Sequence, residues 1–154
     1  MGHVELGPED LGDVMWVGSI GSIPIGYDDD PRHEQIRRMH HDANVIAQAL
    51  YSADELLGGL SHDNAWVRCE CIPRLFARWG SDPRVEQRLL QLIVSDDAAA
   101  VRDRAIMQML HFEPRLESIE VIRSQSNHPD PDVRESVDYV LTHWAFTDPR
   151  AGTL

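Results

Sequence analysis

The fold of this chain can be inferred from the stretch Asp97-Ala98-Ala99-Ala100-Val101-Arg102-Asp103-Arg104-Ala105-Ile106-Met107-Gln108-Met109-Leu110. It contains an acidic turn, a Val-Arg pair and then an amphipathic helix. The same pattern occurs at Asp63-Asn64-Ala65-Trp66-Val67-Arg68 and at Asp130-Pro131-Asp132-Val133-Arg134. The valines are 34 (101 − 67) and 32 (133 − 101) residues apart, a period typical of helical repeat arrays. We therefore predict an all-α right-handed solenoid of about three and a half helix pairs, with a non-helical N-terminal arm.

Apolar residues recur at helical spacing through most of the chain after residue 32. The spacing predicts helices at about 33–51, 53–60, 64–79, 83–95, 98–111, 114–126 and 131–146. Asp30-Pro31 and Ser81-Asp82-Pro83 are typical helix starts. Pro73, by contrast, falls inside a predicted helix and should kink it. We divide the chain into an acidic arm or cap at 1–32, a repeat domain at 33–146 and a loose tail at 147–154.

The charge balance limits the classes of partner. The net charge is −12, from 26 acids and 14 bases, and every base is arginine. Lysine chemistry is therefore excluded, and so negative a chain should repel nucleic acid and anionic membranes while attracting basic proteins. The sequence shows no membrane span and no signal peptide. Cys69 and Cys71 are too poorly placed on a helix to form a disulfide, so we expect a reduced, cytoplasmic protein.

The first 30 residues differ from the rest. They contain no base and seven acids, namely Glu5, Glu9, Asp10, Asp13, Asp28, Asp29 and Asp30. The stretch 14–26 is rich in β-branched residues and glycine, which favours an extended segment or a small hairpin. We expect this arm to cover the first helix pair, because terminal repeats need capping. The alternative is an apolar lid or partner-binding arm that includes Trp16.

At its three Val-Arg units the chain resembles HEAT-like repeats, in particular the short type known from phycobilin lyases and many bacterial proteins. The residues that carry the resemblance are Val67-Arg68, Val101-Arg102 with Ala105, and Val133-Arg134, each preceded by an acid. It covers about residues 54–146 and implies stacked helix pairs that share one core. It says almost nothing about function, because one fold serves many functions.

The arginines of the Val-Arg units are expected to be structural. We predict that Arg68, Arg102 and Arg134 form a ladder with acids of the same or adjacent turns. These acids are Asp63, Asp97 and Asp130 or Asp132. Of the tryptophans in the repeat region, Trp79 and Trp144 lie on apolar stripes and are predicted core residues. Trp66 lies in a repeat turn and is a candidate exposed anchor.

The histidines and cysteines do not combine into a catalytic motif. His40 and His41 are neighbours on a predicted helix and cannot face one site. HEAT-fold deoxyhypusine hydroxylases hold iron with repeated His-Glu pairs, and only His33-Glu34 matches that pattern. Cys69-Glu70-Cys71 lacks the four converging ligands of a zinc site, and nucleophile-elbow and phosphate-loop motifs are absent. We predict no enzyme activity, no cofactor and no bound metal.

The second helix of each pair should line the concave surface of the array. Projecting these helices away from their apolar stripes gives a row of candidate partner-binding residues. The row contains Glu55, Gly58, Arg84, Gln87, Arg88, Gln91, Glu117, Val121, Ser124 and Gln125. Its mixed polarity suits a protein surface better than a small-molecule pocket, and the alternative is a solvated face. We add the acids Asp28, Asp29 and Asp30 to the predicted interface.

These observations together predict a non-enzymatic protein-binding module. Its sharpest form is a small acidic bacterial immunity protein that neutralises a basic toxin or effector domain, because acidity steers association with a cationic partner. One alternative is a scaffold or adaptor subunit of a larger assembly. The other is a metal- or lyase-type enzyme on the same scaffold, suggested only by the histidines and by the lyase-type repeat resemblance. The sequence does not fix the oligomeric state.

Overall fold

The computed structural model describes residues 31–152, and this part of the chain is all α-helical. It has seven α-helices, two short 3-10 helices and no strand between these residues. The α-helices are α1 Pro31–Gln48, α2 Ala53–Gly59, α3 Ala65–Trp79, α4 Pro83–Ser95, α5 Ala99–Gln108, α6 Leu116–Arg123 and α7 Pro131–Trp144. The 3-10 helices are η2 Met109–His111 and η3 Pro149–Ala151. The predicted arm at 1–32, with its Trp16 and acids, lies almost entirely outside the described residues.

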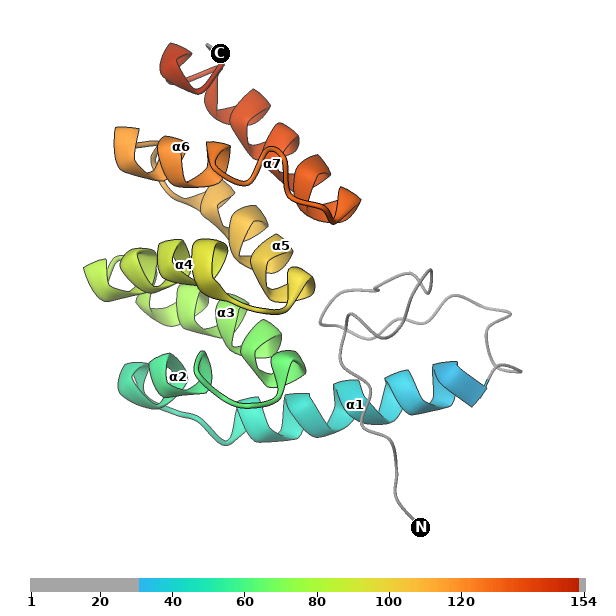
Figure 1. The fold of residues 1–154 in the computed structure, drawn as a ribbon. Coiled ribbons are helices and arrows are strands. Elements are labelled where there is room, and N and C mark those ends of the chain that lie inside the picture. The colour runs from blue at the N-terminus through green and yellow to red at the C-terminus, as the bar shows by residue number, and fades with distance from the viewer. Residues whose placement is uncertain (1–30, 153–154) are drawn as a thin grey trace.

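The helices form two layers (Figure 1). In one layer α1 packs on α3, α3 on α5 and α5 on α7. In the other, α2 packs on α3, α4 on α5 and on α6, and α6 on α7. The order of the helices along the chain is therefore also their order in space, so that the structure grows from α1 towards α7. None of the helices between residues 31 and 152 combines the length and apolar character that a bilayer crossing requires.

Side-chain caps explain where several helices begin. The Asn64 side chain accepts a hydrogen bond from the Trp66 amide at the start of α3, and Asp82 does the same for Arg84 at the start of α4. Asp130 caps α7 through the Asp132 amide. Each cap satisfies a backbone N–H that the first helical turn leaves without an intrahelical partner. The predicted start at Ser81-Asp82-Pro83 is confirmed.

α3 runs from Ala65 to Trp79 with Pro73 inside it, close to the predicted 64–79. Other helix bounds differ from the predictions: α1 ends at Gln48 and α6 at Arg123, each about three residues early. α5 tightens into the 3-10 helix η2 after Gln108. The C-terminal segment is not loose as predicted, because it forms η3, in which Ala151 is buried. Arg123 Nη2 donates to the backbone carbonyl of Arg150 at 2.7 Å, which ties this segment to α6.

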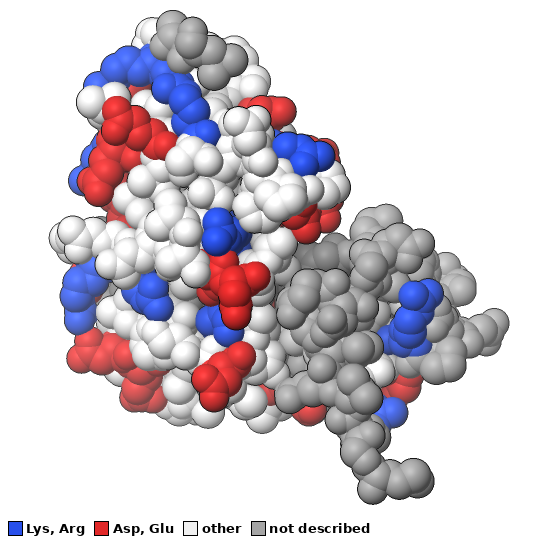
Figure 2. Space-filling model, viewed as in Figure 1, with Lys and Arg blue, Asp and Glu red and all other residues white. Residues whose placement is uncertain are grey.

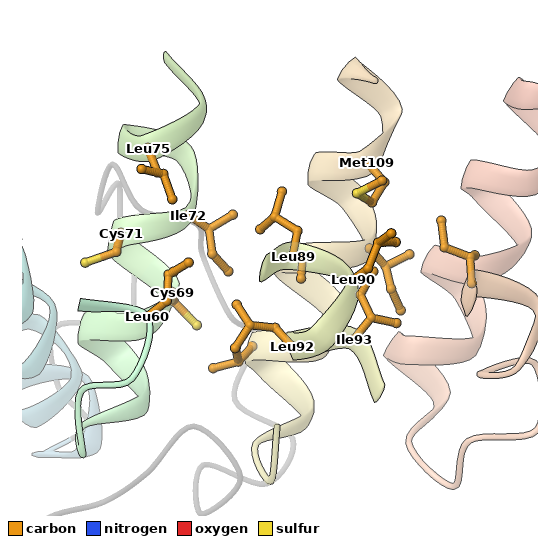
Figure 3. Close-up of a cluster of buried hydrophobic side chains, with 14 of the residues drawn as sticks. Leu60, Cys69, Cys71, Ile72, Leu75, Leu89, Leu90, Leu92, Ile93 and Met109 are labelled. Carbon is orange, nitrogen blue, oxygen red and sulfur yellow. The ribbon is translucent and has the colours of Figure 1, made fainter. Parts of the chain in front are cut away.

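One apolar core runs between the layers. Figure 3 shows its centre, where Leu89 of α4 lies between Ile72 of α3 and Met109 of η2, and Ile93 of α4 belongs to the same cluster. All four side chains are fully buried. Burial of apolar area is the main favourable term in folding, and this core joins consecutive helix pairs. The wide apolar stripe predicted for 83–95 is confirmed, except that Val94 is half exposed.

The tryptophans and Gly59 show how tightly the first helices pack. Trp66 is 1% exposed, so the prediction of an exposed anchor is wrong. Its ring lies edge-on against the His40 ring of α1, with 4.7 Å between ring centroids. A Cβ atom at Gly59 would lie 2.5 Å from Cys71 Sγ, so α2 approaches α3 closely only because this residue is glycine. Trp144 is buried and Trp79 half-buried.

Candidate functional site

The predicted partner-binding row lies on α2, α4 and α6. Most of its members are exposed, Arg88 and Val121 are half-buried, and Gln125 alone is buried. The exposed members are Glu55, Gly58, Arg84, Gln87, Gln91, Glu117 and Ser124. The three helices lie in one layer (Figure 1). A hydrogen bond joins Arg84 of α4 to Asp54 of α2, and another joins Arg115, just before α6, to Glu86 of α4. Seven of the ten positions of the row are thus exposed on helices of one layer.

Ion pairs within the chain neutralise much of the charge on this surface. Arg84 Nη1 of α4 lies 2.7 Å from Asp54 Oδ1 of α2, and its Nη2 lies 2.8 Å from Asp82 Oδ2. Arg115 Nη2 lies 2.8 Å from Glu86 Oε2. Figure 2 shows the consequence on the visible face, where acidic and basic side chains lie beside one another. A partner docking on α2, α4 and α6 would meet a mixed surface, not a strongly acidic one.

Hydrogen bonds from Arg84 hold the pKa of the Asp82 carboxyl below its usual range, and the same contacts raise the pKa of Arg84. Both groups stay charged at neutral pH. The Glu55 carboxylate accepts hydrogen bonds from the Ser52 hydroxyl and from the Tyr51 amide, at 3.2 and 3.4 Å. Glu55 therefore also completes the N-terminal cap of α2.

Gln125 has a structural contact that the helix projection did not predict. Its side-chain Oε1 accepts a hydrogen bond of 2.8 Å from Arg102 Nη1, and the residue is 8% exposed. The turn after α6 therefore points Gln125 into the molecule. Its place in the predicted row is wrong for this reason, whereas Ser124 beside it is exposed.

Arg68 is the most completely bonded of the three predicted ladder arginines. Its Nε and Nη2 meet the two carboxylate oxygens of Asp96 at 2.9 and 3.0 Å, the forked geometry that suits a guanidinium best. Nη1 donates to the carbonyls of His62 and Asp63 at 2.8 and 3.1 Å. The exposed Asp97 adds a further contact at 3.0 Å. The sequence analysis named Asp97 as a ladder acid, and its contact with Arg68 is present, but the fork goes to the neighbouring Asp96.

Arg102 and Arg134 also donate hydrogen bonds to loop carbonyls, as Arg68 does. Arg102 Nε donates to the Asp96 carbonyl at 2.6 Å, and Arg134 Nη1 donates to the His128 carbonyl at 2.7 Å. In all three units the arginine thus fixes the loop six residues before it. The side-chain partners differ from the predicted ladder, because Arg102 reaches Gln125 and not an acid. The contact that the three arginines share is a hydrogen bond to a loop carbonyl, not an ion pair with an acid.

A second polar cluster, which was not predicted from the sequence, lies between α1, α3 and α5. The Glu70 side chain is 3% exposed, and its Oε2 lies 3.9 Å from Arg74 Nη2. Arg74 also donates to the side chain of Asn44 on α1. Burial raises the pKa of the Glu70 carboxyl, although Arg104 and Arg74 oppose the change. Glu70 Oε1 has no hydrogen-bond partner within 31–152.

His40 lies beside this cluster. Burial, helped by the charge of Arg104, lowers its pKa to about 4, so that the ring is neutral at physiological pH. A neutral imidazole can ligate a metal, but among the described residues no three His, Cys, Asp or Glu side chains gather as metal ligands. His41 is exposed, so the two neighbours face different surroundings, as the helix geometry predicted.

The two cysteines are free and buried. Burial raises the pKa of the Cys69 thiol to about 12 and that of Cys71 to about 11. Thiols with such pKa values are poor nucleophiles and poor metal ligands at neutral pH, because the thiolate is the reactive form. The structure thus supports the reading of both residues as small core side chains.

Comparison with known proteins adds no relative, since no family model, curated protein or solved structure matches the chain. The resemblance to HEAT-like repeats therefore rests on the three Val-Arg units alone. The structure brings most of the predicted row into one surface, and Asp28, Asp29 and Asp30 lie outside the described residues. The polar groups found here can hold helices together and can meet a protein partner.

Proposed function

We propose that this chain is a non-enzymatic protein-binding module, built as a HEAT-like solenoid, whose partner is a basic protein. The sharpest form of the proposal is a bacterial immunity protein that neutralises a cationic toxin or effector domain. The resemblance at the Val-Arg units supports the solenoid, and the packing of consecutive helices in two layers agrees with it. The net charge of −12 supports the choice of partner.

One observation carries the choice of a basic partner. Most of the arginines bond to groups of the chain itself, as Arg68, Arg84 and Arg115 do. Many acids take part in no ion pair with a residue of 31–152; examples are the exposed Glu117 and Glu135. A partner therefore meets a surface whose unpaired charge is negative. Such a field raises the association rate of a cationic protein.

The experiment is capture of the partner followed by kinetics. The tagged full chain is used to purify its partner from the native host, and the partner is identified by mass spectrometry and then purified alone. We expect a basic domain that binds one to one, with an association rate constant that falls steeply as NaCl rises. A neutral or acidic subunit that binds at a rate independent of salt would contradict the inhibitor and support an adaptor instead.

Elemental analysis tests the non-enzymatic part of the proposal separately. Untagged protein should contain no stoichiometric iron or zinc. A metal present at one equivalent, and lost on substitution of His40 or His41, would favour the enzyme alternative. This measurement does not depend on finding the partner.

A further inference from the structure

Equivalent positions in α3, α5 and α7 have very different surroundings. The second, fifth, sixth and ninth residues after each Val-Arg valine fall on one side of a helix, because their spacing is three to four residues. In α3 they are Cys69, Ile72, Pro73 and Phe76, and from α5 into η2 they are Asp103, Ile106, Met107 and Leu110. In α7 they are Glu135, Asp138, Tyr139 and Thr142.

This side of each helix faces the next helix pair. Phe76 of α3 packs against Phe112, which follows η2, with 5.2 Å between ring centroids. Asp103 of α5 accepts a hydrogen bond from the Ser136 hydroxyl of α7. All eight of these residues in α3, α5 and η2 are buried or half-buried. The four in α7 are all exposed, because within 31–152 no further α-helix follows α7 (Figure 1).

The exposed side of α7 combines unpaired acids with aromatic rings. Glu135 and Asp138 are exposed and form no ion pair with any described residue. Tyr139 is 47% exposed and Phe146 is 85% exposed. The Tyr139 ring stacks on the His143 ring at 4.1 Å between centroids, which holds it in place on the surface. We call Glu135, Asp138, Tyr139 and Thr142 the α7 end face; the exposed Phe146 follows in the turn after α7.

The α7 end face differs from the surface of α2, α4 and α6 in its charge. On that surface Arg84 and Arg115 neutralise Asp54, Asp82 and Glu86, although Glu117 takes part in no ion pair with a described residue. On the end face neither Glu135 nor Asp138 takes part in one. Asp138 occupies the position of the fully buried Ile72 and Ile106. A second copy of this acidic chain would therefore place a negative surface against Asp138. A helix that brings arginine or lysine would instead neutralise it.

We propose that the α7 end face binds a basic amphipathic helix of a partner protein, seated against α7 as α7 is seated against α5. Arginine or lysine side chains of that helix pair with Glu135 and Asp138, and its apolar residues cover Tyr139 and Phe146. Aromatic rings of this kind are frequent energetic centres of interfaces, and a guanidinium over Tyr139 adds a cation–π contribution. The inference rests on the proposed function only in that the partner is basic, and it assigns a different surface.

The test uses the full chain and a defined peptide. The probe is an 18-residue helical peptide, acetylated and amidated at its ends and labelled with fluorescein. Pairs of Arg and pairs of Leu alternate along one face of this helix. Its twin carries Glu in place of Arg. Binding is followed by fluorescence anisotropy at low ionic strength. We expect the Arg peptide to bind and the Glu twin not to bind.

The decisive comparison is between two matched charge reversals. Glu135→Arg with Asp138→Arg changes two acids three residues apart on α7. Glu113→Arg with Glu120→Arg, which we call the α6 variant, makes the same change in net charge at exposed residues just before and on α6, outside the predicted partner-binding row. If only the net negative charge of the protein attracted the Arg peptide, both variants would weaken its binding equally. We expect the α7 variant to weaken binding about ten-fold and the α6 variant less than about three-fold.

Aromatic truncation gives a second comparison. Tyr139→Ala should weaken binding of the Arg peptide, whereas Tyr51→Ala, at a residue 72% exposed beyond α1, should not. Circular dichroism checks that every variant keeps its helices. Equal weakening by both charge reversals, or a failure of the Arg peptide to bind, would overturn the assignment of the α7 end face. The proposed function would survive either result if the captured partner is still basic and salt-sensitive.

Discussion

The paired Arg68 and Asp96 side chains allow the sharpest prediction on stability. Their side chains are 11% and 4% exposed, and the pair joins α3 to the loop before α5 through two parallel hydrogen bonds. Asp96 Oδ1 also accepts a hydrogen bond from the Ala98 amide at 2.9 Å. The pair thus holds the beginning of α5 against α3.

Replacing Arg68 by methionine leaves the Asp96 carboxylate buried without its cation. Removing one partner of a buried pair costs about 3–5 kcal/mol. The carbonyls of His62 and Asp63 lose a donor as well, at about 1 kcal/mol each or less. We expect Arg68→Met to lower the free energy of unfolding by about 4 kcal/mol and the midpoint of thermal unfolding by about 10 °C.

Arg134 provides the matched control, because it donates to the equivalent carbonyls of His128 and Pro129 and is exposed. Arg134→Met should cost only about 1 kcal/mol. Urea unfolding followed by circular dichroism measures both variants. The difference between them isolates the contribution of the Asp96 contact. If Arg68→Met and Arg134→Met lower stability equally, by about 1 kcal/mol or less, the assignment of a structural ion pair is refuted.

Three further predictions concern α1, α2 and α3. Burial lowers the pKa of His40 to about 4, so between about pH 6.5 and 4 the unfolded chain binds a proton at His40 that the folded chain does not. As the pH falls through this range, the free energy of unfolding should therefore decrease by about 2 kcal/mol more in the natural protein than in His40→Gln. Urea unfolding at a series of pH values measures this difference. Gly58→Ala should stabilise the protein by about 0.5–1 kcal/mol, because a Cβ atom there meets open space. Gly59→Ala should destabilise it by about 1–3 kcal/mol, because its Cβ atom would clash with Cys71. If thermal unfolding ranks the two variants the other way, the packing of α2 on α3 is contradicted. Cys69 and Cys71 should resist iodoacetamide at pH 8 in the folded state and react once urea unfolds the chain, and rapid labelling of the native protein would show that α3 is not buried as described.

Regular features of the sequence predicted most of the helical architecture. The bounds of α4 agree with the prediction of 83–95, because Asp82-Pro83 marks the start and a wide apolar stripe marks the length. The end of α5 was less predictable, since Met109 and Leu110 continue the apolar pattern although the backbone tightens into η2. Tertiary packing decides such ends, and local sequence does not contain that information.

Contacts between distant residues could not be predicted from spacing alone. Asp96 and Asp97 are adjacent acids that both contact Arg68, and only the folded loop shows which of them forms the two parallel hydrogen bonds. Gln125 was assigned to the surface by extending the helical projection past Arg123, where α6 has already ended. Glu70 lies between two cysteines in the sequence, and its burial depends on α1 and α5, which are far from it along the chain.

The proposed function requires that the unpaired negative charge of this chain attracts a basic protein. The most direct measurement is the association rate constant of the captured partner, by stopped flow, across a series of NaCl concentrations. The measurement compares the natural chain with a chain in which Asp29, Glu55 and Glu117 are changed to Arg together, with circular dichroism to confirm the helices. We predict a rate constant that falls steeply with salt and is lower in the triple variant at every low salt concentration. A rate constant that ignores both the salt and the triple change would contradict electrostatic recognition of a basic partner.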